Sequence, residues 1–198
     1  WNWGLSVQQS PYLSGGFLSG FTQVDGELAF AEQSIIQRQT YRSVGGALAY
    51  PFSPTHRIEL GGSFDQITFD QEVQTQLFSL ATGRLISDRT ETTSLADPLH
   101  LGTATIATVT DSSLFGATSP IAGRRSRFSL APTAGSISFL GATADYRRYF
   151  MPVEFYTIAG RLMHIGRYGS GGEDSRLLPL FIGYPELVRG YSIGSFSA

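Results

Sequence analysis

Hydrophobic and polar residues alternate along the start of the chain. The apolar positions of this first stretch are Trp1, Trp3, Leu5 and Val7, with polar or small residues between them. A period of two residues predicts a β-strand with one apolar face and one polar face. The same pattern returns in six further segments, at 41–50, 57–69, 99–111, 124–133, 138–150 and 155–169. The sequence therefore predicts about seven strands and no helix.

The segments between these strands differ in length. Residues 13–34 are rich in Gly and Ser and residues 72–98 are polar and rich in Thr, so both are predicted as long loops. Prolines at 51–54 and 151–154 interrupt the strand pattern and predict tight turns there. Long and short connections thus alternate, as expected for an antiparallel up-and-down meander.

Two architectures are compatible with this pattern. A soluble β-sandwich would bury the apolar faces against a second sheet, whereas a transmembrane β-barrel would turn them to lipid and the polar faces to a wet lumen. Small residues on the apolar faces and the alternating connections favour the barrel. Aromatic side chains beside the tight turns would form its interfacial girdle. These aromatic residues are Tyr50, Phe52, Tyr146, Phe150 and Tyr156.

Composition narrows the choice of function. Charged residues make up only 15% of the chain and aromatics 13%, against about 25% charged residues in an ordinary globular domain. The net charge of −2 provides no global field for nucleic acid, and the absence of cysteine excludes disulfides and thiolate metal sites. The chain opens on Trp-Asn-Trp without a methionine or basic segment, so we expect any export signal to lie upstream.

Charged side chains gather on the polar faces of the predicted strands. The set consists of Arg125, Arg127, Asp145, Arg147, Arg161 and Arg167, with Glu59 from an earlier strand. Cross-strand ion pairs that satisfy one another are one interpretation. The other is a charged lumen that shapes the passage of a polypeptide or an ion.

Other motifs give little support for enzymatic chemistry. Gly190–Gly194 fits G-x-S-x-G but lacks the strand and helix of a nucleophile elbow, and GRYGSGGEDS lacks the GK[ST] of a phosphate loop. His56, His100 and His164 are far apart in sequence. His164 falls on the lipid-facing side of its strand, which indicates a position near the interface or, alternatively, an error in the predicted register. An acidic group at Asp65, Asp70 and Glu72 is solvated loop charge or, alternatively, a divalent-ion bridge to lipopolysaccharide or a loop calcium site. No catalytic residue, metal or cofactor is expected.

The segment from 123 to 192 resembles a known family. It contains two strands joined by a turn, then LPLFIGY, then Val188, Arg189, Gly190 and Tyr191. This VRG-aromatic motif in that setting is similar to the C-terminal barrel of the BamA-type superfamily (bacterial surface antigen barrels), which includes TamA, FhaC and organellar relatives. The resemblance is clearest over 99–194. It implies an outer-membrane barrel of about sixteen strands, of which this chain would contain about seven from the middle.

The resemblance also implies a function. Family barrels assist insertion or translocation of outer-membrane proteins without covalent chemistry, so the partners would be outer-membrane lipid or lipopolysaccharide and unfolded protein clients. The remaining strands and periplasmic domains of the parent chain would be further partners, and the location would be the outer membrane of a Gram-negative-type bacterium. A barrel that anchors or exports an attached domain is the alternative.

In the family, the loop carrying the VRG-aromatic motif folds back into the lumen, here residues 169–198. An arginine in that setting is costly unless its five donors find partners. Arg189 is therefore expected to latch the loop inside the barrel, while the two long connections at 13–34 and 72–98 would be extracellular.

Overall fold

The protein is built from β-strands. The computed structural model describes residues 1–24 and 26–180, and within them it contains strands and turns but no helix. The strands are β1 (Asn2–Val24), β2 (Glu27–Ser53), β3 (His56–Ser79), β4 (Leu85–Asp111), β5 (Leu114–Phe115), β6 (Pro120–Gly135), β7 (Phe139–Val153) and β8 (Tyr156–Tyr168). The predicted all-β class is confirmed, and the seven expected strands correspond to the seven long ones.

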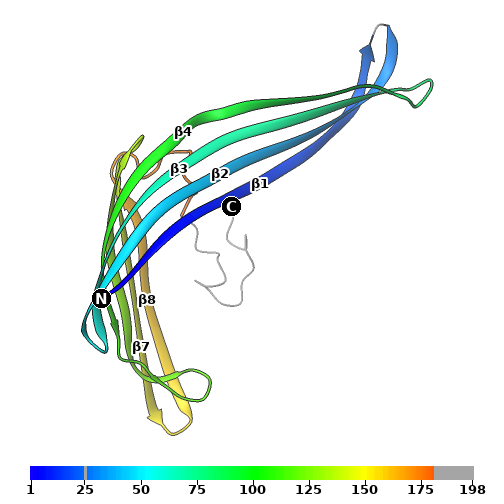
Figure 1. Cartoon of the computed structure of the whole chain (residues 1–198). Helices are drawn as coiled ribbons and strands as arrows, with labels where there is room; N and C mark the ends of the chain where they lie inside the picture. Colours follow the sequence, from blue (N-terminus) through cyan, green and yellow to red (C-terminus); the bar gives the residue numbers. More distant parts are fainter. Residues whose placement is uncertain (25, 181–198) are drawn as a thin grey trace. The chain divides into compact units, whose positions relative to one another are not determined.

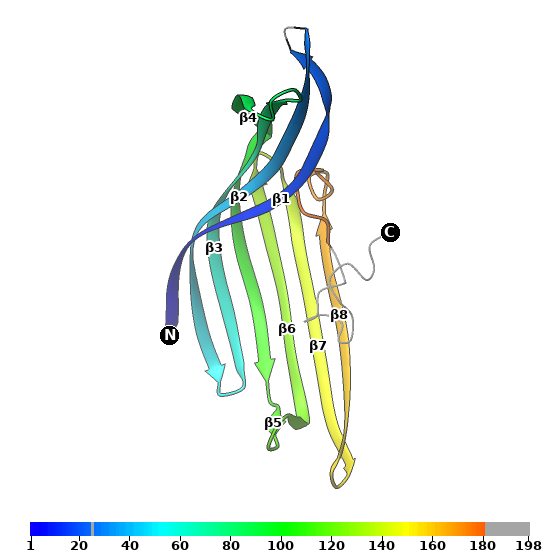
Figure 2. The same cartoon turned by 90° about the vertical axis from the view of Figure 1, so that its right-hand side faces the viewer.

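These strands form one antiparallel sheet. Its order is β1-β2-β3-β4-β6-β7-β8, with the two-residue β5 paired to β6. Figures 1 and 2 show each long strand next to its neighbour in this order. Such a meander follows from short connections, because strands joined by a tight turn pair with each other most easily. The described residues provide no second sheet, which the sandwich alternative would require.

The chain divides into two compact units. Unit 1 comprises Trp1–Trp3, Ala47–Gly61 and Thr103–Ala198, and unit 2 comprises Gly4–Gly46 and Gly62–Gly102. Strands β1 to β4 contribute residues to both units, whereas β6, β7 and β8 belong to unit 1 alone. Glu59 and the six charged residues predicted on the polar faces of the later strands lie in unit 1, whereas the acidic group Asp65, Asp70 and Glu72 lies in unit 2.

The prediction of long loops at 13–34 and 72–98 is wrong. Residues 13–24 continue β1, 27–34 open β2, 72–79 complete β3 and 85–98 open β4. Polar side chains of these segments bond across the sheet. Gln33 donates to the Thr75 hydroxyl at 3.1 Å, and Gln74 and Gln76 both donate to Asp88.

One glycine of these segments, Gly15, lies in close contact with the neighbouring strand. A Cβ on Gly15 would lie 2.9 Å from the backbone oxygen of Ile35 on the next strand. Glycine inside a strand often marks such a close approach of two backbones. At Gly15, the glycine that helped to predict a loop therefore reflects tight contact between β1 and β2.

The two predicted tight turns are confirmed. One lies at Pro54 and Thr55 between β2 and β3, the other at Glu154 and Phe155 between β7 and β8. Phe155 has a φ of 68°, which is uncommon for a residue with a side chain. Both turns join their strands directly and so fix which residues of the two strands face each other.

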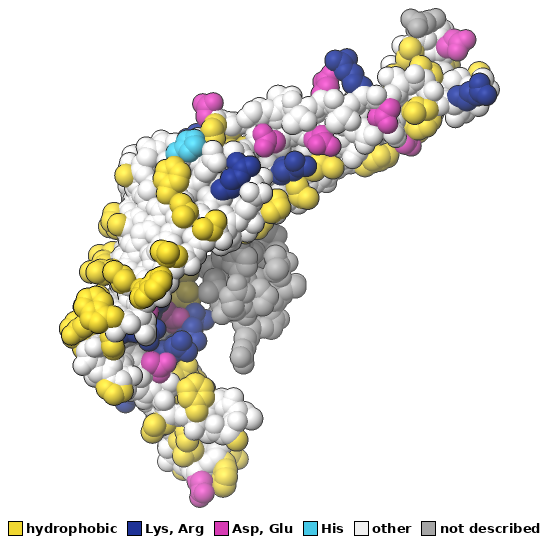
Figure 3. All heavy atoms as spheres, in the orientation of Figure 1, with side chains coloured by type: hydrophobic (Ala, Val, Ile, Leu, Met, Phe, Trp, Pro, Cys, Tyr) yellow, Lys and Arg dark blue, Asp and Glu magenta, His cyan; other side chains and the backbone are white. Residues whose placement is uncertain are grey.

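Little apolar surface is buried among the described residues. The buried hydrophobic side chains are Ala29, Ile67, Leu99, Leu101, Ala107 and Val109. Larger apolar side chains stay outside: Trp1, Trp3 and Leu162 are 79%, 73% and 75% exposed. Hydrophobic groups therefore stand on the surface of both units, as Figure 3 shows.

Candidate functional site

The register of three neighbouring strands lines up three arginines. Arg125 on β6 faces Arg147 on β7, and Arg147 faces Arg161 on β8. The adjacent row pairs Arg127 with Asp145 and Asp145 with Met163. Residues two apart on a strand share a face, so both rows lie on the same side of the sheet. Like charges directly opposite each other repel, so this face needs anions.

Asp145 supplies the anion for two of these arginines. Arg147 donates to it through Nε at 3.2 Å and Nη2 at 2.7 Å, and Arg161 through Nε at 3.0 Å and Nη2 at 2.9 Å. Each guanidinium thus binds the carboxylate with two bonds, the strong fork geometry of arginine pairs. The Asp145 side chain is only 17% exposed, so it lies between its partners close to the sheet.

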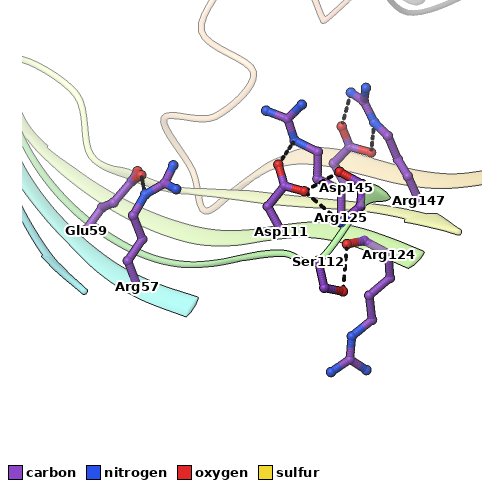
Figure 4. Close-up of polar contacts among 9 residues, drawn as sticks. Arg57, Glu59, Asp111, Ser112, Arg124, Arg125, Asp145 and Arg147 are labelled. Carbon is purple, nitrogen blue, oxygen red and sulfur yellow. Dashed lines mark hydrogen bonds and ion pairs between the residues drawn. The ribbon is translucent and has the colours of Figure 1, made fainter. Parts of the chain in front are cut away.

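Two more carboxylates complete the charge pattern. Glu59 on β3 pairs with Arg57 at 2.7 Å and also with Arg127, which reaches it across β4. Asp111 at the end of β4 lies 3.5 Å from Arg125. Figure 4 shows Arg125 and Arg147 beside Asp111 and Asp145, whereas the head of the neighbouring Arg124 points to the other side of the ribbon.

We call this group the arginine–carboxylate cluster. Its members are Arg57, Glu59, Asp111, Arg125, Arg127, Asp145, Arg147 and Arg161. The five arginines and three carboxylates leave two positive charges in excess. A cavity of about 220 Å³ opens among Arg57, Arg125, Arg127, Asp145 and Arg147. The cluster can therefore attract and hold an anion.

The cluster compares well with the sequence prediction. Arg125, Arg127, Asp145, Arg147 and Arg161 come together as expected, and the predicted mutual ion pairs are present. Arg57 and Asp111 were not predicted as members. The alternation of apolar and polar residues around Arg57 placed it on a polar face. Only the pairing of strands that are distant in sequence brings it to this cluster.

Arg167 lies apart from the cluster, although it was predicted with it. Its register partner is Gly141, its Nη1 donates to the backbone oxygen of Leu178 at 2.9 Å, and its guanidinium sits 5.9 Å from the centre of the Phe139 ring. Arg167 therefore holds the segment that follows β8.

That segment contains an ion pair of its own. Arg176 donates to Asp174 through its side chain and its backbone N–H, each at 2.9 Å. These bonds lower the pKa of the Asp174 carboxyl to about 2, chiefly through the side-chain bond from Arg176. The pair closes a short turn immediately after the last described strand.

Of the predicted interface aromatics, Tyr50, Phe52, Phe150 and Tyr156 lie near the tight turns, whereas Tyr146 lies in the middle of β7. Tyr50 makes edge contacts at 4.9 Å with both Trp1 and Phe52, and Phe52 stacks on His56 at 5.6 Å. Tyr146 lies in register between Ser126 and Leu162, Phe150 faces Ile158, and Tyr156 faces Val153 beside the second turn. Their predicted position at a membrane interface stays a prediction.

An apolar groove occupies the opposite face of unit 1. Its cavity of about 420 Å³ is lined by Ile58, Ile106, Ala107, Thr108, Phe128, Ser129, Leu130, Ala142, Thr143, Ala144 and His164. His164 bonds to the Tyr168 hydroxyl at 2.6 Å on this same face. The apolar register expected for His164 is therefore confirmed, with tyrosine as its polar partner.

The described residues offer no metal site. They contain no group of three or more His, Cys, Asp or Glu side chains placed to hold an ion. Glu72 lies 3.9 Å from Arg38, and Asp65 accepts from Ser63 at 2.8 Å. Strand alternation puts Asp65 on the opposite face of β3 from Asp70 and Glu72, which argues against a shared divalent ion.

The described residues also contain no helix long and apolar enough to span a bilayer. The predicted latch, Val188, Arg189, Gly190 and Tyr191, lies outside the described residues, as does the G-x-S-x-G stretch. Of the predicted loop at 169–198, the structure describes residues 169–180, which form turns and irregular chain.

Comparisons with protein-family models, curated proteins and solved structures find no match to this chain.

Proposed function

We propose that this chain is part of a transmembrane β-barrel of the BamA type that assists insertion or translocation of outer-membrane proteins. The proposal places it in the outer membrane of a Gram-negative-type bacterium. Its partners would be lipid or lipopolysaccharide, unfolded protein clients, and the remaining strands and periplasmic domains of the parent chain. The VRG-aromatic motif and the strand pattern support the family assignment.

The distribution of side chains on the sheet carries this proposal. On one side of unit 1, large apolar residues such as Phe128, Leu130 and Leu162 are exposed, and the other side holds the arginine–carboxylate cluster. Water penalises such an apolar surface, whereas lipid covers it at no cost. The charged side would then face a wet lumen. The inner strands of an antiparallel sheet pair with neighbours on both sides, and the remaining strands of the parent barrel would pair with the edges β1 and β8, as a membrane requires.

The proposed activity requires no covalent chemistry. As the family resemblance implies, clients would enter beside a weakly paired seam where the bilayer is thinned, and the barrel provides the scaffold. Arg189 would hold its loop in the lumen through its five donors. Loss of that latch would leave the loop mobile and weaken client insertion.

An anchor or export barrel for an attached domain is the second candidate. The charged cluster is the observation that supports its export form, because a lumen lined by fixed charges selects among ions and chains that pass through. The insertion function predicts that an added client protein folds faster, whereas the anchor or export barrel predicts no acceleration.

The test uses the complete parent protein in proteoliposomes. An unfolded outer-membrane protein is added, and its folding is followed by heat-modifiable gel mobility against empty liposomes. We expect faster folding with the wild type and a reduced rate with Arg189→Ala.

Arg89→Ala is the matched control, because Arg89 is an exposed arginine paired with Glu91 in unit 2. It should fold the client as fast as the wild type. Absence of acceleration by the wild type would refute the insertion function and favour the anchor or export barrel. If the wild type and Arg189→Ala accelerate client folding equally, the latch role of Arg189 is contradicted, while the insertion function is still supported.

A further inference from the structure

We propose that the arginine–carboxylate cluster is a binding site for a phosphate group. The proposal is independent of the membrane role, since it depends only on side chains of unit 1. The proposal gives the polar face a ligand. The ion pairs alone would indicate only a structural role for these residues.

The arrangement of charge within the cluster is the first argument. Two of the three carboxylates lie deep, with Asp145 and Glu59 at 17% and 22% exposure, while Arg125 and Arg127 reach 54% and 45% and Asp111, the partner of Arg125, is 36% exposed. An approaching ligand therefore meets the guanidinium groups of Arg125 and Arg127 before it meets Asp145 or Glu59. Every carboxylate is already engaged by at least one arginine, so repulsion of an incoming anion is reduced.

The match of size and charge is the second argument. A cavity needs only about 10–15 Å³ to admit a water molecule, so the 220 Å³ among these arginines has room for a phosphate group with several waters. A phosphate monoester carries about −1.5 to −2 at neutral pH, which balances the two excess positive charges. Its three terminal oxygens also suit several arginines better than the two oxygens of a carboxylate.

The origin of the lining residues is the third argument. Arg57 comes from β3, Arg125 and Arg127 from β6, and Arg147 from β7. Rigid paired strands hold these groups in fixed positions, and the opposition of Arg125 and Arg147 is relieved when an anion binds between them. A planar guanidinium fork is well suited to phosphate oxygens.

Inorganic phosphate is the probe for the first experiment. It is titrated calorimetrically into the complete protein in a sugar-headed, phosphate-free detergent at constant ionic strength. We expect saturable binding at one site. Arg125→Gln should weaken it about tenfold or more, because one charged pair of hydrogen bonds to the ligand is lost. The phosphate affinity of Arg125→Lys should lie between those of the wild type and Arg125→Gln, because lysine keeps the charge but lacks the planar fork of donors.

Two further variants sharpen the test. Arg89→Gln removes the same charge from an exposed pair in unit 2 and should bind phosphate like the wild type. Asp111→Asn should tighten binding, because it frees Arg125 from its carboxylate partner. Gel mobility and circular dichroism establish that each variant is folded, and Asp111→Asn decides the question if Arg125→Gln does not fold.

A competition experiment distinguishes two sources of the phosphate group, a lipid headgroup and a free phosphate compound. Short-chain phosphatidic acid that displaces phosphate far better than glycerol 3-phosphate would indicate a lipid headgroup, and equal competition would indicate a free phosphate compound; both support the site. No saturable phosphate binding, or equal weakening by Arg125→Gln and Arg89→Gln, overturns it. Tighter binding of a glutamate-rich peptide than of phosphate also overturns it and points to a polypeptide carboxylate.

Discussion

Asp145 binds two guanidinium groups at once, so its replacement should destabilise the protein. Arg147 and Arg161 both bond to it, and Arg147 is opposed by Arg125 on its other side. Asp145→Asn removes the negative charge and leaves three arginines in a row. We expect the free energy of unfolding to fall by about 2 kcal/mol, measured by urea denaturation of the complete protein in micelles.

Glu91→Gln provides the comparison for Asp145→Asn. Glu91 pairs with Arg89 at 2.8 Å, but both side chains are mostly exposed. Exposed ion pairs contribute about 0–1 kcal/mol, so this variant should unfold almost like the wild type. Equal losses in the two variants would contradict a special role for the shared carboxylate.

The pH response of Asp174 can be derived from its contact with Arg176. Its pKa in the folded protein is about 2, and in the unfolded chain it is about 3.9. A lowered pKa means that the stabilising contribution is present above about pH 4 and is lost as the pH falls toward 2. Carbon NMR of the Asp174 carboxyl should therefore show a midpoint near 2, moving up toward the ordinary value in Arg176→Gln. A wild-type midpoint near 4 would disprove the contact.

At the scale of elements, the glycines of β1 test whether residues 13–24 form a paired strand. A methyl group on Gly15 would meet the Ile35 backbone oxygen at 2.9 Å, whereas one on Gly4 meets nothing within 4 Å. Gly15→Ala should therefore lower the free energy of unfolding by about 1–2 kcal/mol. Gly4→Ala should leave it unchanged or raise it by about 0.5–1 kcal/mol. Identical thermal unfolding of both variants would favour a loop at Gly15.

Sequence pattern located the strands but misjudged their length. Trp1 to Val7 alternate strictly, so that strand was evident, whereas the glycines at 15 and 16 and the Thr-rich stretch in β4 suggested loops. The reason is physical. A strand with polar surroundings on both faces has no apolar side to reveal its period, and a glycine required by a neighbouring backbone has the composition of a turn.

The candidate site was predictable to the extent that its strands are neighbours. Arg125, Asp145 and Arg161 lie on successive strands β6, β7 and β8, and their shared face follows from local alternation. Alternation also placed Glu59 on a polar face, but its pairing with Arg127 arises only because β3 lies across β4 from β6. Such a pairing depends on the register of strands far apart in sequence, and no local pattern encodes that distance.

At the scale of the whole molecule, the two tryptophans distinguish a lipid-facing sheet from a soluble one. Trp1 and Trp3 are the chain's only tryptophans, lie on the same side of β1 and are 79% and 73% exposed. If the proposed barrel is correct, these rings contact the bilayer, where tryptophan favours the interface. Brominated lipids should then quench their fluorescence strongly, and aqueous iodide should quench it weakly.

The measurement uses the complete protein in vesicles, with the contribution of these residues obtained by difference from Trp1→Phe and Trp3→Phe. Trp1 also contacts Tyr50 at 4.9 Å, so its ring is held beside the tight turn between β2 and β3. Quenching should therefore be greatest with bromines placed near the headgroups and should decline as they move toward the acyl chain ends. Strong quenching by iodide with no quenching by brominated lipid would contradict the membrane location, because the exposed tryptophan rings would then face water.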